Sequence, residues 1–288
     1  MRYSDWMTAG RVALMSSAVM GATLVSGVAG AEESFRGTTD IKGITMSPVS
    51  VLPAAPEPAK KRESCTSRIE PKTTAGQLVA AKGWAVTGEV KVGRYTVVSF
   101  VGQCEQGGSG TEVMTQGNLG IFSDKLLAIA YTRQADDLLI GTVRKLDGGG
   151  ARLYDGDRLG APVADLRLTD AGEFTLASLA AFDPVCGRRA KVPNVFNLPI
   201  DKARKRIMDA GWKPVEAKLE EDQGYENDLH KAGVTEADGC AGTGMGYCSF
   251  EYTGAFGKLS VTTTGDPDVK KGDFPKVLKY EVTCGGAK

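Results

Sequence analysis

The chain has 288 residues, and its 35 basic and 35 acidic side chains give a formal net charge of zero. A balanced charge argues against a general nucleic-acid-binding protein, which needs a basic excess to displace counterions from phosphates, so we expect no nucleic-acid partner. The only histidine, His230, lies in a polar, charged segment. That count excludes a zinc site built from several histidines, and the segment lacks the sharp glycine-rich turn of a nucleophile elbow.

Residues 1–31 have the pattern of a secretory signal peptide. Arg2 and Arg11 flank a short polar start, and the stretch from Val12 to Ala31 carries no charge and ends in small residues. We expect cleavage after Ala31. The alternative is a membrane-spanning helix, which needs about 20 apolar residues; this stretch only just reaches that length and is diluted by Gly, Ser and Thr. No later stretch approaches it, so we expect no transmembrane segment after cleavage and a periplasmic or secreted bacterial protein.

Residues 32–64 are predicted to be a disordered tether. The segment is rich in Ala, Ser and Thr and shows little hydrophobic periodicity. It also contains several prolines: Pro48, Pro53, Pro56 and Pro58. Such a composition cannot bury enough apolar surface to offset the conformational entropy lost on ordering. We therefore expect the folded part to begin near Cys65, as one large domain or two small ones.

All the cysteines lie beyond the predicted signal peptide. They are Cys65, Cys104, Cys186, Cys240, Cys248 and Cys284. An even number in an exported chain predicts a set of disulfides, and none of the cysteines forms a Cys-x-x-Cys pair that would indicate a redox or zinc site. The most local candidate pair is Cys240–Cys248, and the long-range pairing stays open. A mixture of paired and free buried thiols is the alternative.

Residues 65–188 are predicted to form a β-rich domain. A short helix is expected over Ala75–Lys82, because Thr73 or Thr74 can cap its start and Gly83 can end it. The apolar runs that follow are separated by turn residues, which is typical of strands joined as hairpins. These runs are Tyr95–Val101, Leu119–Phe122, Leu126–Thr132, Leu138–Lys145, Ala151–Tyr154, Val163–Leu168 and Glu173–Leu179. Successive hairpins predict antiparallel sheets in a sandwich or a curled meander.

Residues 189–288 are predicted to form a small α+β domain, so that the whole chain is α+β and mainly β. Pro199 opens a helix over Ile200–Ala210 with apolar residues on one face. Strands are expected at Lys213–Leu219, Ser249–Tyr252, Lys258–Thr264 and Val277–Thr283. Trp84 and Trp212 each stand where a helix leads into a strand, so we expect core anchors rather than a sugar-binding platform.

Part of this second region, residues 192–265, resembles the PASTA modules of bacterial wall-associated proteins. The matching positions are Val192, Pro193, Val195, Ala203, Ile207, Ala210 and Gly211, followed by the closing run Gly257–Gly265. The segment departs from the pattern at Asn197, where the family usually has glycine, and in the middle, where Cys240 and Cys248 replace a Pro-Gly segment. The resemblance implies a β-α-β-β-β module at the cell envelope that binds wall peptide or glycan, and it transfers no catalytic residues.

Two glycine-rich segments are candidate binding loops. One contains Gly108 and Gly110, and the other contains Gly242 and Gly244 with Tyr247 beside them. Neither has the Lys-Ser/Thr ending of a phosphate loop or the spacing of a dinucleotide-binding turn. We expect both to be loops beside disulfides whose backbone can contact a partner. The pattern gives no catalytic residue, no metal ligand and no cofactor.

Three functions remain open at this point. The first is a non-catalytic exported binding protein of the bacterial envelope, whose partner is an envelope glycan such as peptidoglycan or an envelope protein. The second is an inhibitor of a secreted hydrolase, a lysozyme or a protease, because rigid loops lose little entropy on docking. The third is a hydrolase that uses carboxylates or a Ser-Lys pair, although no pair is singled out by the pattern.

Overall fold

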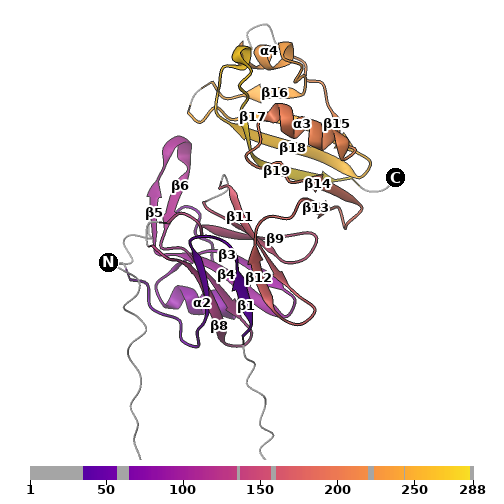
Figure 1. Ribbon diagram of the computed structural model, residues 1–288. Coiled ribbons are helices and arrows are strands. Elements are labelled where there is room, and N and C mark those ends of the chain that lie inside the picture. The colour runs from indigo at the N-terminus through magenta and orange to yellow at the C-terminus, as the bar shows by residue number, and fades with distance from the viewer. Residues whose placement is uncertain are drawn as a thin grey trace, which may run out of the picture.

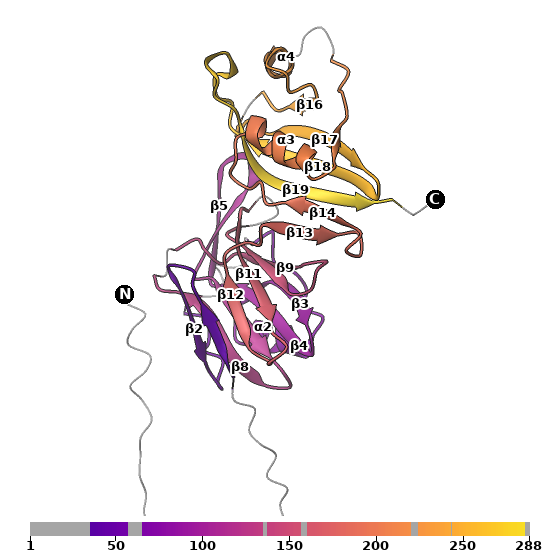
Figure 2. The same ribbon diagram turned by 45° about the vertical axis from the view of Figure 1, so that its right-hand side comes forward.

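A computed structural model describes residues 35–56, 65–134, 137–156, 160–219, 224–242 and 244–285. The predicted signal peptide lies outside these residues. The described chain forms an N-terminal β body and a C-terminal α+β body that sits at one end of it (Figures 1 and 2). The structure therefore confirms the predicted fold class, which is mainly β with antiparallel sheets followed by an α+β region.

The N-terminal body consists of two five-stranded sheets. The first has the order β2 (Ile44–Pro48), β8 (Leu126–Thr132), β7 (Asn118–Phe122), β4 (Tyr95–Val101) and β3 (Ala85–Val92). The second has the order β1 (Gly37–Thr39), β12 (Phe174–Ala177), β11 (Pro162–Leu168), β10 (Ala151–Tyr154) and β9 (Thr142–Lys145). Their facing side chains, among them Val97, Ile121, Leu153 and Phe174, form one apolar core. The body is thus a sandwich, as the successive hairpins predicted.

Helix α2 (Thr74–Ala81) covers the outer face of the first sheet. The hydroxyl of Thr73 caps it by accepting a hydrogen bond of 3.0 Å from the Gly76 amide. Gly83 follows its end at a φ of 86°, a left-handed conformation that glycine adopts without steric cost. The predicted helix and its capping residues are confirmed to within one residue.

The predicted hairpins are confirmed because their register is set locally. Strands β7 and β8, β9 and β10, and β11 and β12 pair antiparallel in sequence order. Between β9 and β10, Gly149 and Gly150 take φ values of 91° and 88°, which a side chain would disfavour. The turn sequence therefore predicts the strand pairing here.

The predicted tether is wrong over residues 35–56, which belong to the β sandwich. β1 pairs parallel with β12 and β2 pairs antiparallel with β8, so both strands find partners far along the chain. Ile44 and Leu52 are only 2% and 4% exposed. Pro48 is tolerated because it ends an edge strand. The rest of the predicted tether, 32–34 and 57–64, lies outside the described residues.

A hairpin of β5 (Gln103–Gln106) and β6 (Glu112–Thr115) stands out from the N-terminal body (Figures 1 and 2). The short 3-10 turn η2 (Gly108–Gly110) forms its tip. At its base, the Cys65–Cys104 disulfide packs beside the buried Met114. The hairpin is therefore fixed covalently to the segment before α2.

The C-terminal body places helix α3 (Ile200–Asp209) on a sheet. The sheet has the order β15 (Lys213–Pro214), β17 (Cys248–Gly254), β18 (Gly257–Thr264) and β19 (Lys276–Cys284), and β16 (Ala237–Cys240) also pairs with β17. The apolar face of α3 packs on Phe250 and Leu259. The predicted α3 is confirmed, and the predicted strands correspond to β17, β18, β19 and, much shortened, β15.

One part of the C-terminal body was not predicted. Helix α4 (Gly224–Lys231) and strand β16 occupy the region between β15 and β17, and the 3-10 turn η3 (Val269–Lys271) lies between β18 and β19. The helix buries only Glu226 and Leu229, so its sequence lacks the periodic apolar stripe that predicts an amphipathic helix. The described order of elements in this region therefore differs from the β-α-β-β-β order that the PASTA resemblance implies.

The expected domain boundary at 188/189 falls inside a hairpin that joins the two bodies. This hairpin consists of β13 (Phe182–Val185) and β14 (Ala190–Pro193), and it lies between the bodies in Figure 2. Val185 and Cys186 pack in the C-terminal core. The C-terminal body therefore begins near residue 182.

Candidate functional site: a cationic groove beside the domain junction

A groove with a volume of about 640 Å³ opens on the C-terminal body. Its walls come from the β13–β14 hairpin, the end of α3 and the turn between β17 and β18. The side chains that give it its character are three cations and three aromatic rings: Arg188, Arg189, Lys191, Phe182, Trp212 and Phe256. A volume of this size is within the range of ligand-binding sites.

The β13–β14 turn carries two of the cations in an unusual backbone conformation. Cys186, Gly187 and Arg188 have φ values of 54°, 66° and 68°, so three consecutive residues are left-handed. For the two non-glycine residues this costs on the order of 1 kcal/mol each, and such conformations persist only where surrounding contacts hold them. Here the contacts are the Cys186–Cys284 disulfide and a 3.0 Å hydrogen bond from Arg188 to the carbonyl of Gly148.

Two of the three groove cations lie over ring faces, and the third, Arg188, binds a backbone carbonyl. The guanidinium carbon of Arg189 lies 5.2 Å from the ring centre of Phe256, and the ammonium of Lys191 lies 4.6 Å from that of Phe182. Arg189 Nε also donates to the carbonyl of Cys186 at 3.0 Å. Within the described part of the chain, none of the groove cations forms an ion pair. The groove therefore carries positive charge in a protein whose net charge is zero.

Trp212 fixes one wall of the groove, and it is the core anchor that the sequence predicted. Its side chain is buried, and its indole Nε1 donates to the carbonyl of Lys191 at 2.9 Å. A Cβ at Gly254 would lie 2.9 Å from the indole ring, so glycine at this position lets the ring lie against strand β17. Strand β14, and with it Lys191, is thereby tied to the sheet.

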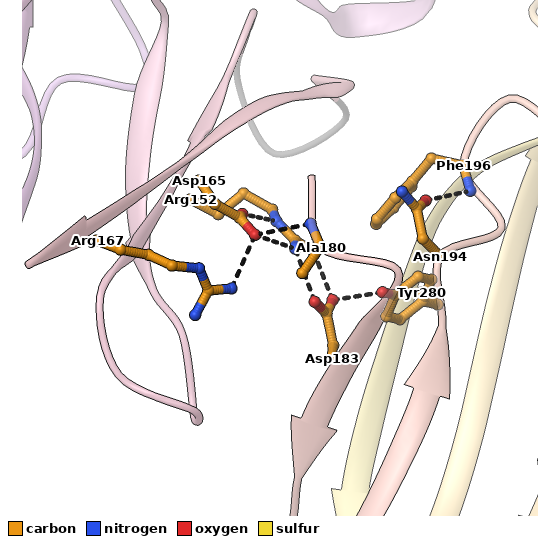
Figure 3. Close-up of polar contacts among 8 residues, drawn as sticks. All are labelled: Arg152, Asp165, Arg167, Ala180, Asp183, Asn194, Phe196 and Tyr280. Carbon is orange, nitrogen blue, oxygen red and sulfur yellow. Dashed lines mark hydrogen bonds and ion pairs between the residues drawn. The ribbon is translucent and has the colours of Figure 1, made fainter. Parts of the chain in front are cut away.

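Beside the groove, a buried ion cluster joins the two bodies (Figure 3). The guanidinium of Arg152 on β10 donates from Nε to Asp165 on β11 and from Nη2 to Asp183 on β13, both at 2.7 Å. The hydroxyl of Tyr280 on β19 donates to Asp183, and Arg167 donates to Asp165 at 3.0 Å. The cluster holds β13, and thus the groove hairpin, against both bodies.

The pKa shifts in this cluster are typical of an ion cluster that stabilises the fold. Burial alone would raise the pKa of Asp165, but hydrogen bonds and charge from Arg152, with the Ala180 amide, outweigh it and hold that pKa below its ordinary value. Burial and the charge of Asp183 raise the pKa of Tyr280. The Phe196 ring stacks on Tyr280, with centroids 4.6 Å apart. Asp165 therefore stays ionised and bound to Arg152, and Asp183 accepts hydrogen bonds from both Arg152 and Tyr280.

The described residues that line the groove favour the binding of an anion. They include no histidine, aspartate or glutamate. His230 lies in α4, where its Nε2 is 3.1 Å from the carbonyl of Ala237. An arginine fork and a lysine over apolar rings can bind an anion with an apolar neighbour.

The predicted binding loops lie elsewhere. Gly108 and Gly110 are at the tip of the β5–β6 hairpin, where an added Cβ would meet nothing within 4 Å. Gly242, Gly244 and Tyr247 lie in the Cys240–Cys248 loop, in which the Ala241 amide donates to the carbonyl of Tyr247 at 2.7 Å. The described residues of these two loops are not among those that line the groove. Their role in binding remains a prediction.

The cysteines form three disulfides, Cys65–Cys104, Cys186–Cys284 and Cys240–Cys248. The local pair is as expected, and no cysteine in the described chain is free. Three disulfides are typical of an extracytoplasmic protein.

The cationic groove was not predicted from the sequence, although the sequence contains one feature that indicates it. Arg188, Arg189 and Lys191 fall within the five positions that follow Cys186. A disulfide next to a dense cationic turn fixes charges in space, whereas the same charges in a free loop are solvated. The aromatic rings come from three separate segments, so only the fold brings them to the cations.

No protein family, curated protein or solved structure matches this chain. Among the described residues there is no group of three or more His, Cys, Asp or Glu side chains that could hold a metal ion. The same residues include no helix that is both long and apolar enough to cross a bilayer.

Proposed function

We propose that the protein is an exported, non-catalytic binding protein of the bacterial envelope and that the cationic groove is its ligand site. The observation that carries this proposal is the groove's chemistry: three cations without carboxylate partners in the described chain, two of which lie over aromatic rings. The disulfides suit a periplasmic or secreted location.

Peptidoglycan is the ligand that this site fits best. Its peptide stems present carboxylates, and its sugars present apolar C–H faces. An arginine fork binds a carboxylate with two parallel hydrogen bonds, and aromatic rings pack against C–H groups. The PASTA resemblance of residues 192–265 points to the same ligand, and α3 and Trp212 lie in that segment.

A sedimentation assay on purified sacculi tests the proposal. We expect the mature protein, residues 32–288, to sediment with sacculi. The double variant Arg189→Gln/Lys191→Gln should lose most of this binding. The matched control is Lys202→Gln/Lys205→Gln on the exposed face of α3, which removes the same charge outside the groove and should bind like the wild type. Wild-type protein that stays in the supernatant would remove the proposal.

Inhibition of a secreted hydrolase is a second candidate, favoured by one observation. The β5–β6 hairpin projects from the body, has an open glycine tip and is braced by the Cys65–Cys104 disulfide (Figure 1). A rigid projecting loop loses little entropy on entering an enzyme cleft. Lysozymes and proteases assayed with and without the protein test this function, and unchanged rates would argue against it. The hydrolase alternative gains nothing from Asp165 and Asp183, because both are bound by Arg152.

A further inference from the structure

We infer that the groove recognises carboxylate groups: Arg188, Arg189 and Lys191 bind the carboxylates of an acidic chain, and the apolar part of that chain lies against Phe182 and Phe256. The inference rests on the proposed function and deepens it, because it names the chemical group that selects the ligand. It also makes the groove, rather than the two glycine-rich loops, the determinant of affinity.

The first argument is charge. The chain is neutral as a whole and pairs the buried Arg152 with Asp165 and the half-buried Arg204 with Glu236, whereas Arg188, Arg189 and Lys191 are exposed. The groove cations instead gather on one hairpin, and none has an ion-pair partner in the described chain. Unpaired cations of one sign in a concave surface attract and hold an anion.

The second argument is preorganisation. Arg189 is held by its bond to the Cys186 carbonyl and by the Phe256 ring, while Arg188 is held by the carbonyl of Gly148. The disulfide and the strained turn fix the backbone from which both side chains start. Ordering a ligand on such side chains therefore costs less rotamer entropy than ordering it on free surface arginines.

The third argument is an exposed apolar floor. Phe182 is 45% exposed, although a ring of its size is normally buried. The ammonium of Lys191 lies over its ring, so the residue offers apolar surface directly beside a charge. A free inorganic anion would leave this apolar surface exposed to solvent, whereas a chain with C–H groups next to its carboxylate would cover it.

The fourth argument distinguishes carboxylate from phosphate. One wall of the groove is the C-terminal end of α3, at Ala210 and Gly211, where the helix dipole is negative. Compact phosphate sites are typically built at the opposite, N-terminal end of a helix. A singly charged carboxylate on the hairpin side meets less repulsion from this wall than a multiply charged phosphate.

The test uses two soluble probes and one modified polymer. Titrating poly-L-glutamate and inorganic polyphosphate into the mature protein by calorimetry compares the two anion classes. Sacculi whose carboxylates have been amidated with a carbodiimide and ammonia are compared with untreated sacculi. We expect poly-L-glutamate to bind better than polyphosphate, and amidated sacculi to retain on the order of a tenth of the binding of untreated sacculi.

The variants locate the effect. Arg189→Gln/Lys191→Gln should weaken poly-L-glutamate binding about tenfold, Phe182→Ala should weaken binding to untreated sacculi, and Lys202→Gln/Lys205→Gln should change neither. Circular dichroism and a urea unfolding curve for each variant separate a lost contact from a lost fold.

The outcomes separate the inference from the proposed function. Equal binding to amidated and untreated sacculi overturns the inference and leaves the function in place. Poly-L-glutamate binding that is lost in the groove variant, without binding to sacculi, supports the inference and overturns peptidoglycan as the ligand. Preference for polyphosphate, or equal loss in the Lys202→Gln/Lys205→Gln control, overturns the inference.

Discussion

At the scale of single residues, Arg152 is 2% exposed, and its guanidinium lies between carboxylates from two different strands. Replacing Asp165 with asparagine leaves this buried cation with one carboxylate instead of two and takes a partner from Arg167. Removing one member of a buried ion cluster costs about 3 to 5 kcal/mol, so we expect a loss of stability near that size. Urea unfolding at pH 7 measures it.

A matched control is the exposed ion pair between Arg36 and Glu173, whose side chains are 60% and 45% exposed. Glu173→Gln should change the free energy of unfolding by less than about 1 kcal/mol, because water screens the pair. If Asp165→Asn had an effect as small as this control, the buried cluster would stabilise the fold no more than a solvated ion pair does.

Glu112 makes the stability of the N-terminal body depend on pH. Burial alone would raise the pKa of Glu112, but hydrogen bonds from Ser67 and Thr66 outweigh it and hold that pKa below its ordinary value. A carboxylate whose pKa is lowered by folding stabilises the fold above its ordinary pKa, and this contribution disappears as the pH falls through the lowered value.

We therefore expect the wild type to exceed Glu112→Gln in stability most clearly near pH 7, and the difference to shrink as the solution becomes acidic. Thermal unfolding of both proteins from pH 7 to pH 3 measures this. A difference that stays constant over the series would show that packing, rather than charge, is lost in the variant.

At the scale of the elements, the contact between Trp212 and strand β17 sets the position of β14. In Gly254→Ala the new methyl group would lie 2.9 Å from the indole, so either the ring or the strand must move. Overpacking of this kind costs about 1 to 3 kcal/mol, and we expect weaker ligand binding as well because Lys191 moves with the ring.

The control for this substitution is Gly239→Ala in β16, where an added Cβ meets nothing within 4 Å. Its urea midpoint and its binding to sacculi should match those of the wild type. An unchanged midpoint in Gly254→Ala would mean that the indole can shift freely and does not hold the groove wall.

The elements that the sequence predicted are those whose evidence is local. The glycine turn between β9 and β10 predicts their hairpin. The capping residue Thr73 and the terminating residue Gly83 predict α2, and both signals lie within a few residues of the element. β1 and β2 were missed because their partners, β12 and β8, lie far along the chain, and a proline-rich composition outweighed their short apolar runs. Secondary-structure propensity reflects the local preference of each residue, whereas these two strands form because they pair with distant strands.

At the scale of the whole molecule, the disulfides differ in what they constrain. Cys186–Cys284 joins residues 98 positions apart, and Cys240–Cys248 joins residues 8 apart. In the chain-entropy description, the longer loop stabilises the fold by roughly 2 kcal/mol more.

We therefore expect Cys186→Ser/Cys284→Ser to lower the thermal midpoint more than Cys240→Ser/Cys248→Ser does, with scanning calorimetry as the measurement. Because the longer bridge also fixes the Arg188 turn, the first variant alone should lose affinity for poly-L-glutamate. Equal loss of affinity in both variants would place the binding site outside the groove.

The candidate site could be predicted only in part. The cysteine count and the position of the cations were visible in the sequence, whereas the long-range pairing and the arrival of Phe182 and Phe256 beside the cations depend on the folded chain. The glycine-rich loops were predicted as binding loops because a glycine-rich composition indicates a flexible backbone. That is weaker evidence for a binding site than charged side chains whose positions are fixed by the fold.

The Cys186–Cys284 bridge has a further consequence for survival among proteases. It closes almost the whole C-terminal body into one covalent ring. A single backbone cut between residues 187 and 283 opens that ring but releases no fragment, so a nicked molecule keeps its full mass on a non-reducing gel and separates into pieces only after a thiol is added. A single cut inside this ring therefore leaves the polypeptide in one covalent piece.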